Sequence, residues 1–281
     1  MGNGSDTPSA VIVVPCYNEE HRIDSEAFLN LAASDGIRLQ FVNDGSSDGT
    51  GPLVRRLMKE TPAIDVIDLP ANVGKAEAVR RGLLAAVESG VPIAGYLDAD
   101  LSTPGSEILR MVRILEQRSD LMAVFGSRIA RLGSRIERSP VRHYTGRVFA
   151  TVASLALGVA VYDTQCGAKV FRVNANLAAA IDHPFRSSWS FDVLLCQRLF
   201  DGTTEVPGLP ISSFLEMPLD DWSDIPGSKL KVTAGAQALI EVLGMAITRR
   251  RDRPPASRAA TNVDSGGLLP TQPDADLRND Q

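Results

Sequence analysis

The sequence predicts a single α/β domain built on a mainly parallel sheet with helices on both faces. Up to Asp120, short β-branched runs alternate with helical stretches, which is the pattern of βαβ crossover units. Polar clusters also follow three of the predicted strands. Ligands bind at the carboxyl ends of the strands in such sheets, so these clusters support the same fold class.

The elements can be placed in order along the chain. We expect strands over 10–17, from 37, over 63–70, over 92–100 and over 121–128, and helices over 22–34, 51–60 and 74–89. Pro52 favours a helix start at its position. The apolar run 148–162 has 15 residues, fewer than the roughly 20 that span a bilayer. We favour a buried helix there over an interfacial one.

The ends of the chain differ in composition from the middle. We expect a flexible N-terminus over 1–9, the domain over 10–229, and an apolar helix over 230–253 that could lie at a membrane interface. The segment 254–281 is rich in Pro, Ser, Gly and Asp, which predicts a disordered tail.

Composition excludes several classes of protein. The net charge of −5 argues against a general nucleic-acid binder. Three cysteines without metal-type spacing favour a reduced, intracellular protein in which they are packing residues. The polar N-terminus has no secretory signal pattern, so we expect a cytoplasmic protein.

The stretch YLDADLSTP (96–104) places two carboxylates, Asp98 and Asp100, two positions apart at a strand end. On a continuing strand they would share a face, which is costly unless a cation lies between them. Mg²⁺ or Mn²⁺ carrying a diphosphate suits such oxygen ligands. The alternative is an ordinary solvated strand-to-turn junction, where Asp is common.

The same D-x-D spacing resembles the haloacid-dehalogenase-type phosphatases. Those proteins carry Thr or Val two residues after the second aspartate, where Ser102 stands here, and they place the motif on the first strand of the fold. Here the motif follows the fourth predicted strand, so this interpretation is disfavoured.

Four motifs occur together in one order. They are VPCYNEE (14–20), VNDGSSDGT (42–50), NVGKAEAVRRG (72–82) and YLDADLSTP (96–104). Together they resemble the family-2 glycosyltransferases of the GT-A fold, over about residues 10–230. Four later motifs, GSR (126–128), DTQCGAKVF (163–171), WSFDVLL (189–195) and WSDIPGSKL (222–230), look like the dolichyl-phosphate β-glucosyltransferase and dolichol-phosphate mannosyltransferase branch.

The resemblance implies an inverting transfer of a hexose, glucose or mannose, from UDP-glucose or GDP-mannose. The acceptor implied is a polyprenyl phosphate or another phosphate-bearing molecule, with Mg²⁺ or Mn²⁺ as cofactor. Implied nucleotide contacts are Pro15, Tyr17, Glu19, Asp44, Gly45, Lys75 and Asp98, and the implied metal ligands are Asp98 and Asp100. Without this resemblance, we would interpret Lys75 as a surface lysine of a helix.

The acceptor decides whether a base is needed. A hydroxyl acceptor requires a general base, and Asp192 stands where this family often keeps one; Asp100 is the other candidate catalytic residue. A phosphate with a second pKa of about 6 is already mostly anionic near neutral pH and needs none. Basic and polar residues would then bind it, and the candidates are Arg128, Arg147, Gln165, Lys169 and Lys229.

The segment 128–147 contains six arginines and a single acid, Glu137. We expect a local positive field there, suited to an anionic acceptor or an anionic lipid surface. A solvated loop is the simpler alternative.

The eukaryotic glucosyltransferases that the chain resembles carry an N-terminal membrane anchor and many bacterial relatives carry C-terminal spanning helices; from the sequence we expect neither in this chain. Either it meets the inner face of the membrane peripherally, through the arginine-rich segment and the helix 230–248, or it is a cytosolic enzyme with a soluble acceptor. A nucleotide-sugar-binding protein without catalysis is disfavoured, because every expected polar position is present.

Overall fold

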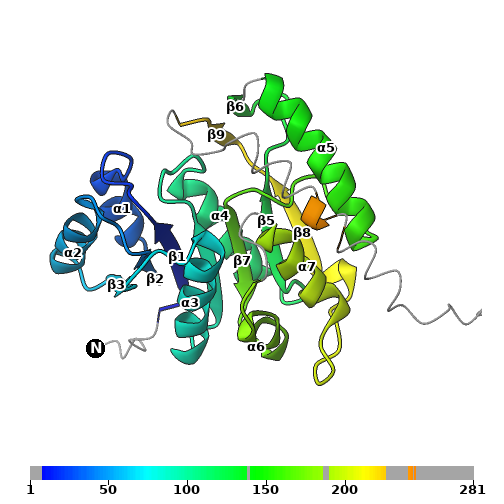
Figure 1. Cartoon of the computed structure of the whole chain (residues 1–281), viewed down its shortest axis with the longest axis horizontal. Helices are drawn as coiled ribbons and strands as arrows, with labels where there is room; N and C mark the ends of the chain where they lie inside the picture. Colours follow the sequence, from blue (N-terminus) through cyan, green and yellow to red (C-terminus); the bar gives the residue numbers. More distant parts are fainter. Residues whose placement is uncertain (1–7, 138–139, 186–189, 226–239, 243, 245–281) are drawn as a thin grey trace, which may run out of the picture.

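The structure, a computed structural model, describes residues 8–137, 140–185, 190–225, 240–242 and 244. Its centre is a seven-stranded sheet in the order β3-β2-β1-β4-β7-β5-β8 (Figure 1). A short two-stranded sheet, β6-β9, lies apart from it.

The first four strands of the central sheet are parallel. They are β1 (Ala10–Cys16), β2 (Ile37–Asn43), β3 (Ile64–Asp68) and β4 (Ile93–Leu97), and they alternate with helices α1 (Ser25–Ala32), α2 (Thr50–Glu60), α3 (Lys75–Glu88) and α4 (Gly105–Gln117). Every residue of β1 and β4 is buried, because helices cover both faces of a parallel sheet.

Alternate side chains of β1 enter two different cores. Val11 and Val13 pack in the cluster that contains Leu83 of α3, whereas Ile12 packs with Phe28 of α1. The helices α1, α2 and α4 therefore cover one face of the sheet, and α3 covers the other.

The second half of the chain completes the sheet. The strands are β5 (Ala123–Ser127), β6 (Arg135–Glu137), β7 (Ala168–Arg172), β8 (Phe214–Pro218) and β9 (Asp221–Ser223), and the helices are α5 (Pro140–Leu157), α6 (Ala175–Asp182), α7 (Phe191–Asp201) and the 3-10 turn η1 (Ile211–Ser213). Strand β7 is antiparallel to both β4 and β5, while β8 is parallel to β5. The helices α5, α6 and α7 share the core of α3.

The structure confirms the predicted fold class, and it adds detail that the pattern does not contain. The helix expected over 22–34 begins at Ser25, because the Asp24 side chain accepts a hydrogen bond from the Ala27 N–H at 3.0 Å and caps it. The antiparallel β7 is not among the predicted strands. The proposed domain boundaries remain predictions, and the tail 254–281 and most of the expected C-terminal helix lie outside the described residues.

Residues 148–157 of the apolar run 148–162 form the C-terminal part of α5, and residues 158–162 lie beyond the helix end. Ala153 and Leu157 are buried, as expected for a core helix, whereas Val148 is 58% and Leu155 67% exposed. Across the described residues, no helix is both long and apolar enough to cross a bilayer.

Candidate active site

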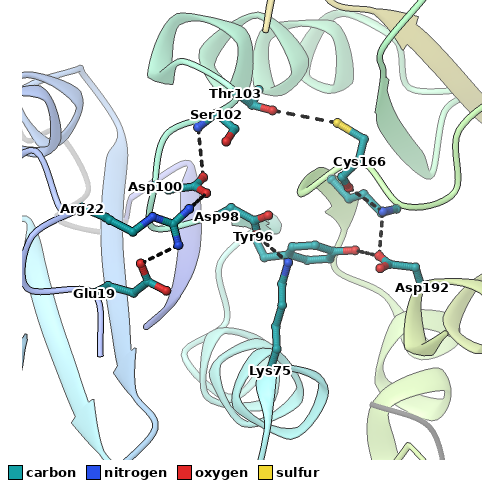
Figure 2. Close-up of polar contacts among 11 residues, drawn as sticks. Glu19, Arg22, Lys75, Tyr96, Asp98, Asp100, Ser102, Thr103, Cys166 and Asp192 are labelled. Atoms are coloured by element: carbon teal, nitrogen blue, oxygen red, sulfur yellow. Dashed lines mark hydrogen bonds and ion pairs between the residues drawn. The ribbon is translucent and has the colours of Figure 1, made fainter. Parts of the chain in front are cut away.

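The predicted nucleotide and metal residues lie where the order of the parallel strands reverses. β1 lies between β2 and β4, and the loops that follow these three strands meet the start of β7 at one edge of the sheet. This topological switch point is where open α/β sheets bind ligands. Figure 2 shows Glu19, Asp98 and Asp100 facing this region from two of these loops.

The loops after β1 and β2 are joined by hydrogen bonds. The Asn18 N–H donates to Ser46 Oγ at 3.1 Å, and the Ser47 N–H donates to Asn18 Oδ1 at 2.9 Å. Asn18 has a φ of 52°, a conformation that Asn tolerates. Tyr17 emerges at the surface with 38% exposure, whereas Pro15 is buried within β1. Of these two predicted nucleotide contacts, only Tyr17 is accessible.

Asp44 holds the loop that leads into α3. Its side chain is buried, and its Oδ1 and Oδ2 accept hydrogen bonds from the N–H groups of Val73 (2.7 Å) and Gly74 (2.9 Å). A β-carbon on Gly45, which has a φ of 64°, would lie 2.4 Å from the Ala71 carbonyl carbon. The expected nucleotide contact of Asp44 is therefore disfavoured, because both carboxylate oxygens already accept backbone hydrogen bonds and the side chain is buried.

Lys75 is the first residue of α3, and its Nζ lies 2.5 Å from Asp98 Oδ1. A cation is unfavourable at a helix N-terminus, so the carboxylate compensates for this placement. Burial would lower the pKa of Lys75, but Asp98, followed by Asp192 and Asp100, raises it above its ordinary value. The lysine stays charged and half-exposed at the site.

The two carboxylates of the D-x-D motif each have a protein cation. The Arg22 guanidinium hydrogen-bonds Asp100 Oδ2 and also donates to Glu19 Oε2 at 2.9 Å (Figure 2). Because β4 ends at Leu97, both aspartates lie in the turn, and the expectation of a shared strand face is wrong. Arg22 is not among the residues that the motifs single out. Its place three residues after Glu19 in a polar loop is the signal that could have identified it.

The donor set suits a divalent ion completed by substrate. Across the part of the chain that the structure describes, no cluster of three or more His, Cys, Asp or Glu side chains could hold a metal. Mg²⁺ typically takes one or two carboxylates, with phosphate and water oxygens for the rest. Asp98 and Asp100 fit that role, since both are oxygen donors that already attract cationic groups.

The backbone of Gly167 approaches Asp98 closely. The Asp98 N–H donates to the Gly167 carbonyl at 3.0 Å, and a β-carbon on Gly167 would lie 2.1 Å from Asp98 Oδ2. Only glycine therefore fits at this position without moving the carboxylate.

Asp192 lies in the first turn of α7 and is buried. Its Oδ1 accepts hydrogen bonds from the Tyr96 hydroxyl and from Lys169 Nζ, the latter at 2.7 Å. Lys169 also donates to the Cys166 carbonyl at 2.8 Å, and its side chain is 0% exposed. The expectation that Lys169 binds an acceptor phosphate is therefore wrong for this geometry, because its ammonium is closed off from solvent. Tyr96 and Cys166, which complete this group, are not among the predicted site residues.

A second group of predicted residues lies around the segment 162–165. Arg128 makes two hydrogen bonds to Asp163, at 2.6 and 2.8 Å. Burial would raise the pKa of Asp163, but Arg128 outweighs it and lowers that pKa to about 2. Glu216 of β8 accepts the N–H groups of Tyr162 and Asp163, both at 2.8 Å, and thereby fixes this segment. Asp163 and Glu216 have no predicted role, although Asp163 opens a quoted motif.

Arg147 of α5 lies next to this pair. Its guanidinium stacks 3.8 Å from the centre of the Tyr162 ring and donates to the Tyr162 carbonyl at 3.0 Å. A narrow cavity of about 10 Å³ is lined by Arg128, Gly146, Arg147, Phe149, Ala150, Tyr162, Asp163, Thr164 and Gln165. Three of the predicted acceptor residues thus share one cavity. A different cavity of about 390 Å³ lies at the opposite sheet edge, near Ser9, and contains no candidate residue.

The expected positive field of the segment 128–147 is reduced, because three of its six arginines have acidic partners in the described part of the chain. Arg131 contacts Asp220, and Arg135 binds Asp221 at 2.8 Å, in addition to the Arg128–Asp163 pair. These acids are distant in sequence, so a count within the segment misses them. Lys229, the last predicted acceptor residue, lies outside the described residues.

Comparison with known proteins agrees with this architecture. The family model "Glycosyl transferase family 2" matches residues 11–177. A dolichyl-phosphate beta-glucosyltransferase of Trichomonas vaginalis is 30% identical, covering 86% of this chain and 72% of the relative. A polyprenol monophosphomannose synthase of Mycolicibacterium smegmatis is 24% identical, covering 88% and 90%.

Solved structures show the same fold. Glucosyl-3-phosphoglycerate synthase from Mycobacterium tuberculosis, crystallised with Mn²⁺, uridine diphosphate and glucosyl-3-phosphoglycerate, has a TM-score of 0.62 at 18% identity, covering 86% of this chain and 80% of that one. Mannosyl-3-phosphoglycerate synthase from Rubrobacter xylanophilus has a TM-score of 0.64 at 12% identity, covering 89% and 78%. The chain belongs to glycosyl transferase family 2 and is a glycosyltransferase of the GT-A fold that uses a nucleotide sugar.

Proposed function

We propose that this enzyme transfers a hexose, glucose or mannose, from a nucleoside diphosphate sugar to a polyprenyl phosphate, with inversion at the anomeric carbon. The observation that carries the proposal is the similarity to a dolichyl-phosphate beta-glucosyltransferase over 86% of the chain. The site chemistry supports it in two places, the carboxylate pair and the cavity beside Arg147.

The donor would bind at the switch point. Tyr17 offers an exposed ring for stacking on the base, and Lys75 offers an ammonium to the diphosphate. Asp98 and Asp100 would hold Mg²⁺ or Mn²⁺. When bound, this ion supplies Lewis-acid stabilisation of the charge on the departing diphosphate. Arg22, which hydrogen-bonds Asp100, would have to share that carboxylate with the ion or move away from it.

The acceptor phosphate would bind at the cavity beside Arg147, which at about 10 Å³ holds about one water and would have to widen to admit a phosphate. Arg128 has its charge balanced by Asp163, whereas no carboxylate pairs with Arg147 among the described residues. The Thr164 hydroxyl is buried and has no hydrogen-bond partner in the described part of the chain. A guanidinium and a hydroxyl donor at one cavity are suited to phosphate oxygens, with Gln165 adjacent.

The bond changes need no proton transfer. An anionic phosphate oxygen of the acceptor forms the new bond to the anomeric carbon, and the bond to the nucleoside diphosphate breaks with its electron pair. The protein's task is to hold both partners in line, which can supply about 7–11 kcal/mol of barrier reduction.

A lipid acceptor requires the site to face a membrane surface. The outward side of α5, next to the cavity, exposes Tyr144 (71%), Val148 (58%) and Leu155 (67%). These side chains recur at helical spacing, so they form one apolar face suited to peripheral contact with lipid. Binding to phosphatidylglycerol vesicles should weaken in the triple variant Tyr144→Ser/Val148→Ser/Leu155→Ser, with transfer to a water-soluble short-chain acceptor retained.

The acceptor and donor can be tested together. Wild-type enzyme is assayed with UDP-glucose and GDP-mannose against short-chain polyprenyl phosphate, the matching polyprenol, and soluble phosphomonoesters. We expect transfer to polyprenyl phosphate and none to polyprenol. Transfer only to soluble phosphomonoesters would replace the lipid acceptor with a soluble one.

Two variants test the residues. Asp100→Ala should abolish metal-dependent transfer while the protein remains folded. Full activity of this variant would show that transfer does not depend on a metal held by Asp100. Arg147→Gln should raise the KM for the acceptor far more than the KM for the nucleotide sugar. Equal effects on both would place Arg147 outside an acceptor subsite.

A further inference from the structure

The buried group formed by Asp192, Lys169 and Tyr96 has no role in the proposed donor or acceptor subsites. It joins three elements, since Asp192 comes from α7, Lys169 from β7 and Tyr96 from β4. Both donors bind the same oxygen, Asp192 Oδ1, and Figure 2 shows the Tyr96 hydroxyl directed at this carboxylate. Lys169 and Tyr96 are each 0% exposed.

Burial makes the charge state of this group hard to change. An unpaired ammonium in a site closed to water is strongly disfavoured, and the carboxylate is the only acid that hydrogen-bonds Lys169 among the described residues. If Asp192 accepted a proton, Lys169 would lose its counter-charge. A general base must accept a proton in each turnover, so this geometry opposes that role for Asp192.

The surroundings reinforce the negative charge. Asp192 lies in the first turn of α7, where the helix dipole favours an anion. The other titratable groups that interact electrostatically with the Asp192–Lys169 pair are Lys75, Asp163, Cys166 and Cys196. Of these, Lys75 is a second cation near Asp192, and it is already paired with Asp98.

We propose that Lys169 and Tyr96 are positioning residues that keep Asp192 as a permanent anionic anchor, so that Asp192 is not the base. The attacking oxygen must then arrive already ionised, as that of a phosphate does. The inference rests on the proposed function and deepens it, because it makes the enzyme selective for phosphate over hydroxyl acceptors.

The first test uses pH profiles of kcat/KM. Asp192→Asn, Tyr96→Phe and the charge-neutral double variant Lys169→Met/Asp192→Asn are compared with wild type, and Asp65→Asn, at an exposed ion pair on β3, is the matched control. Each is assayed with polyprenyl phosphate and with the corresponding phosphonate, whose second ionisation occurs at higher pH.

We expect an acid limb near the acceptor's second pKa of about 6 in every variant, moving upward with the phosphonate. Activity of the double variant should fall by less than the roughly 10²–10⁴-fold that a general base contributes. Loss of the acid limb together with a fall of that size, in a double variant that still binds UDP, would overturn the inference.

The second test is a stability cycle that does not depend on the acceptor. Asp192→Asn and Lys169→Met should each lower the thermal midpoint of unfolding. The double variant should recover part of that decrease, because it leaves no buried charge without a partner. If the decreases of the two single variants simply add in the double variant, the anchoring role of Asp192 is refuted. If wild type uses no phosphate acceptor at all, the proposed function fails, and this cycle alone then decides the anchoring role.

Discussion

The Arg128–Asp163 pair gives a prediction that can be worked from the structure. Both side chains are largely buried, with 15% and 8% exposure, and the Asp163 carboxylate also accepts the N–H groups of Arg128 and Gln165. Asp163→Asn removes the charge with little change of shape. It leaves the Arg128 guanidinium without a counter-charge, and breaking a buried pair in this way costs about 3–5 kcal/mol.

The pH dependence follows from the lowered pKa of Asp163. The folded-state pKa is about 2 against an ordinary 3.8, so ionised Asp163 stabilises the fold by roughly 2 kcal/mol above pH 4. Because the folded pKa is the lower one, this stability is complete above the unfolded pKa and is lost as pH falls through the folded pKa. About 1 kcal/mol of it is gone by pH 3, and Asp163→Asn should not show that loss.

Urea unfolding at pH 7 and pH 3 measures both effects. The double variant Arg128→Met/Asp163→Asn should recover part of the stability, because it strands no charge. Arg135→Gln, at a solvent-exposed pair, is the control and should leave the midpoint unchanged. Equal stability of wild type and Asp163→Asn at pH 7, with equal pH slopes, would refute the assignment of Asp163 as the counter-ion.

Three further predictions concern the donor side of the site. Gly167→Ala should weaken binding of UDP with Mn²⁺ in calorimetry, because the added methyl displaces the Asp98 carboxylate; unchanged affinity would mean that the carboxylate is not a ligand. Asp44→Ala should lower stability by about 1–3 kcal/mol and speed amide exchange at the start of α3, since it strands two backbone N–H groups; unchanged exchange would contradict its role in holding this loop. Arg22→Ala should tighten binding of Mn²⁺ alone, measured by electron paramagnetic resonance, because it removes the cation that competes for Asp100; weaker binding would show that Arg22 supports the site instead.

Local pattern predicted the first half of the fold well. The strands from Ala10 to Leu97 are apolar runs bounded by turns, and the helices between them are periodic, so β1, β2 and β3 are neighbours in the sheet as in the sequence, whereas β4 pairs with β1. The antiparallel β7 is harder to predict. It lies between β4 and β5, and its place depends on pairing with strands that are distant in the chain.

The candidate site also contains residues that local sequence pattern indicates and partners that only the fold brings together. The sequence and its family resemblance were sufficient to select Asp98, Asp100 and Lys75 as candidates, because each follows or precedes a predictable element; their roles remain predictions. The partners of those residues were decided by tertiary structure. Arg22 reaches Asp100 across 78 positions, and Lys169 and Tyr96 converge on Asp192 from separate strands. Charge balance depends on proximity in space rather than in sequence, which is why Arg128, Arg131 and Arg135 have acidic partners that a count within the arginine-rich segment misses.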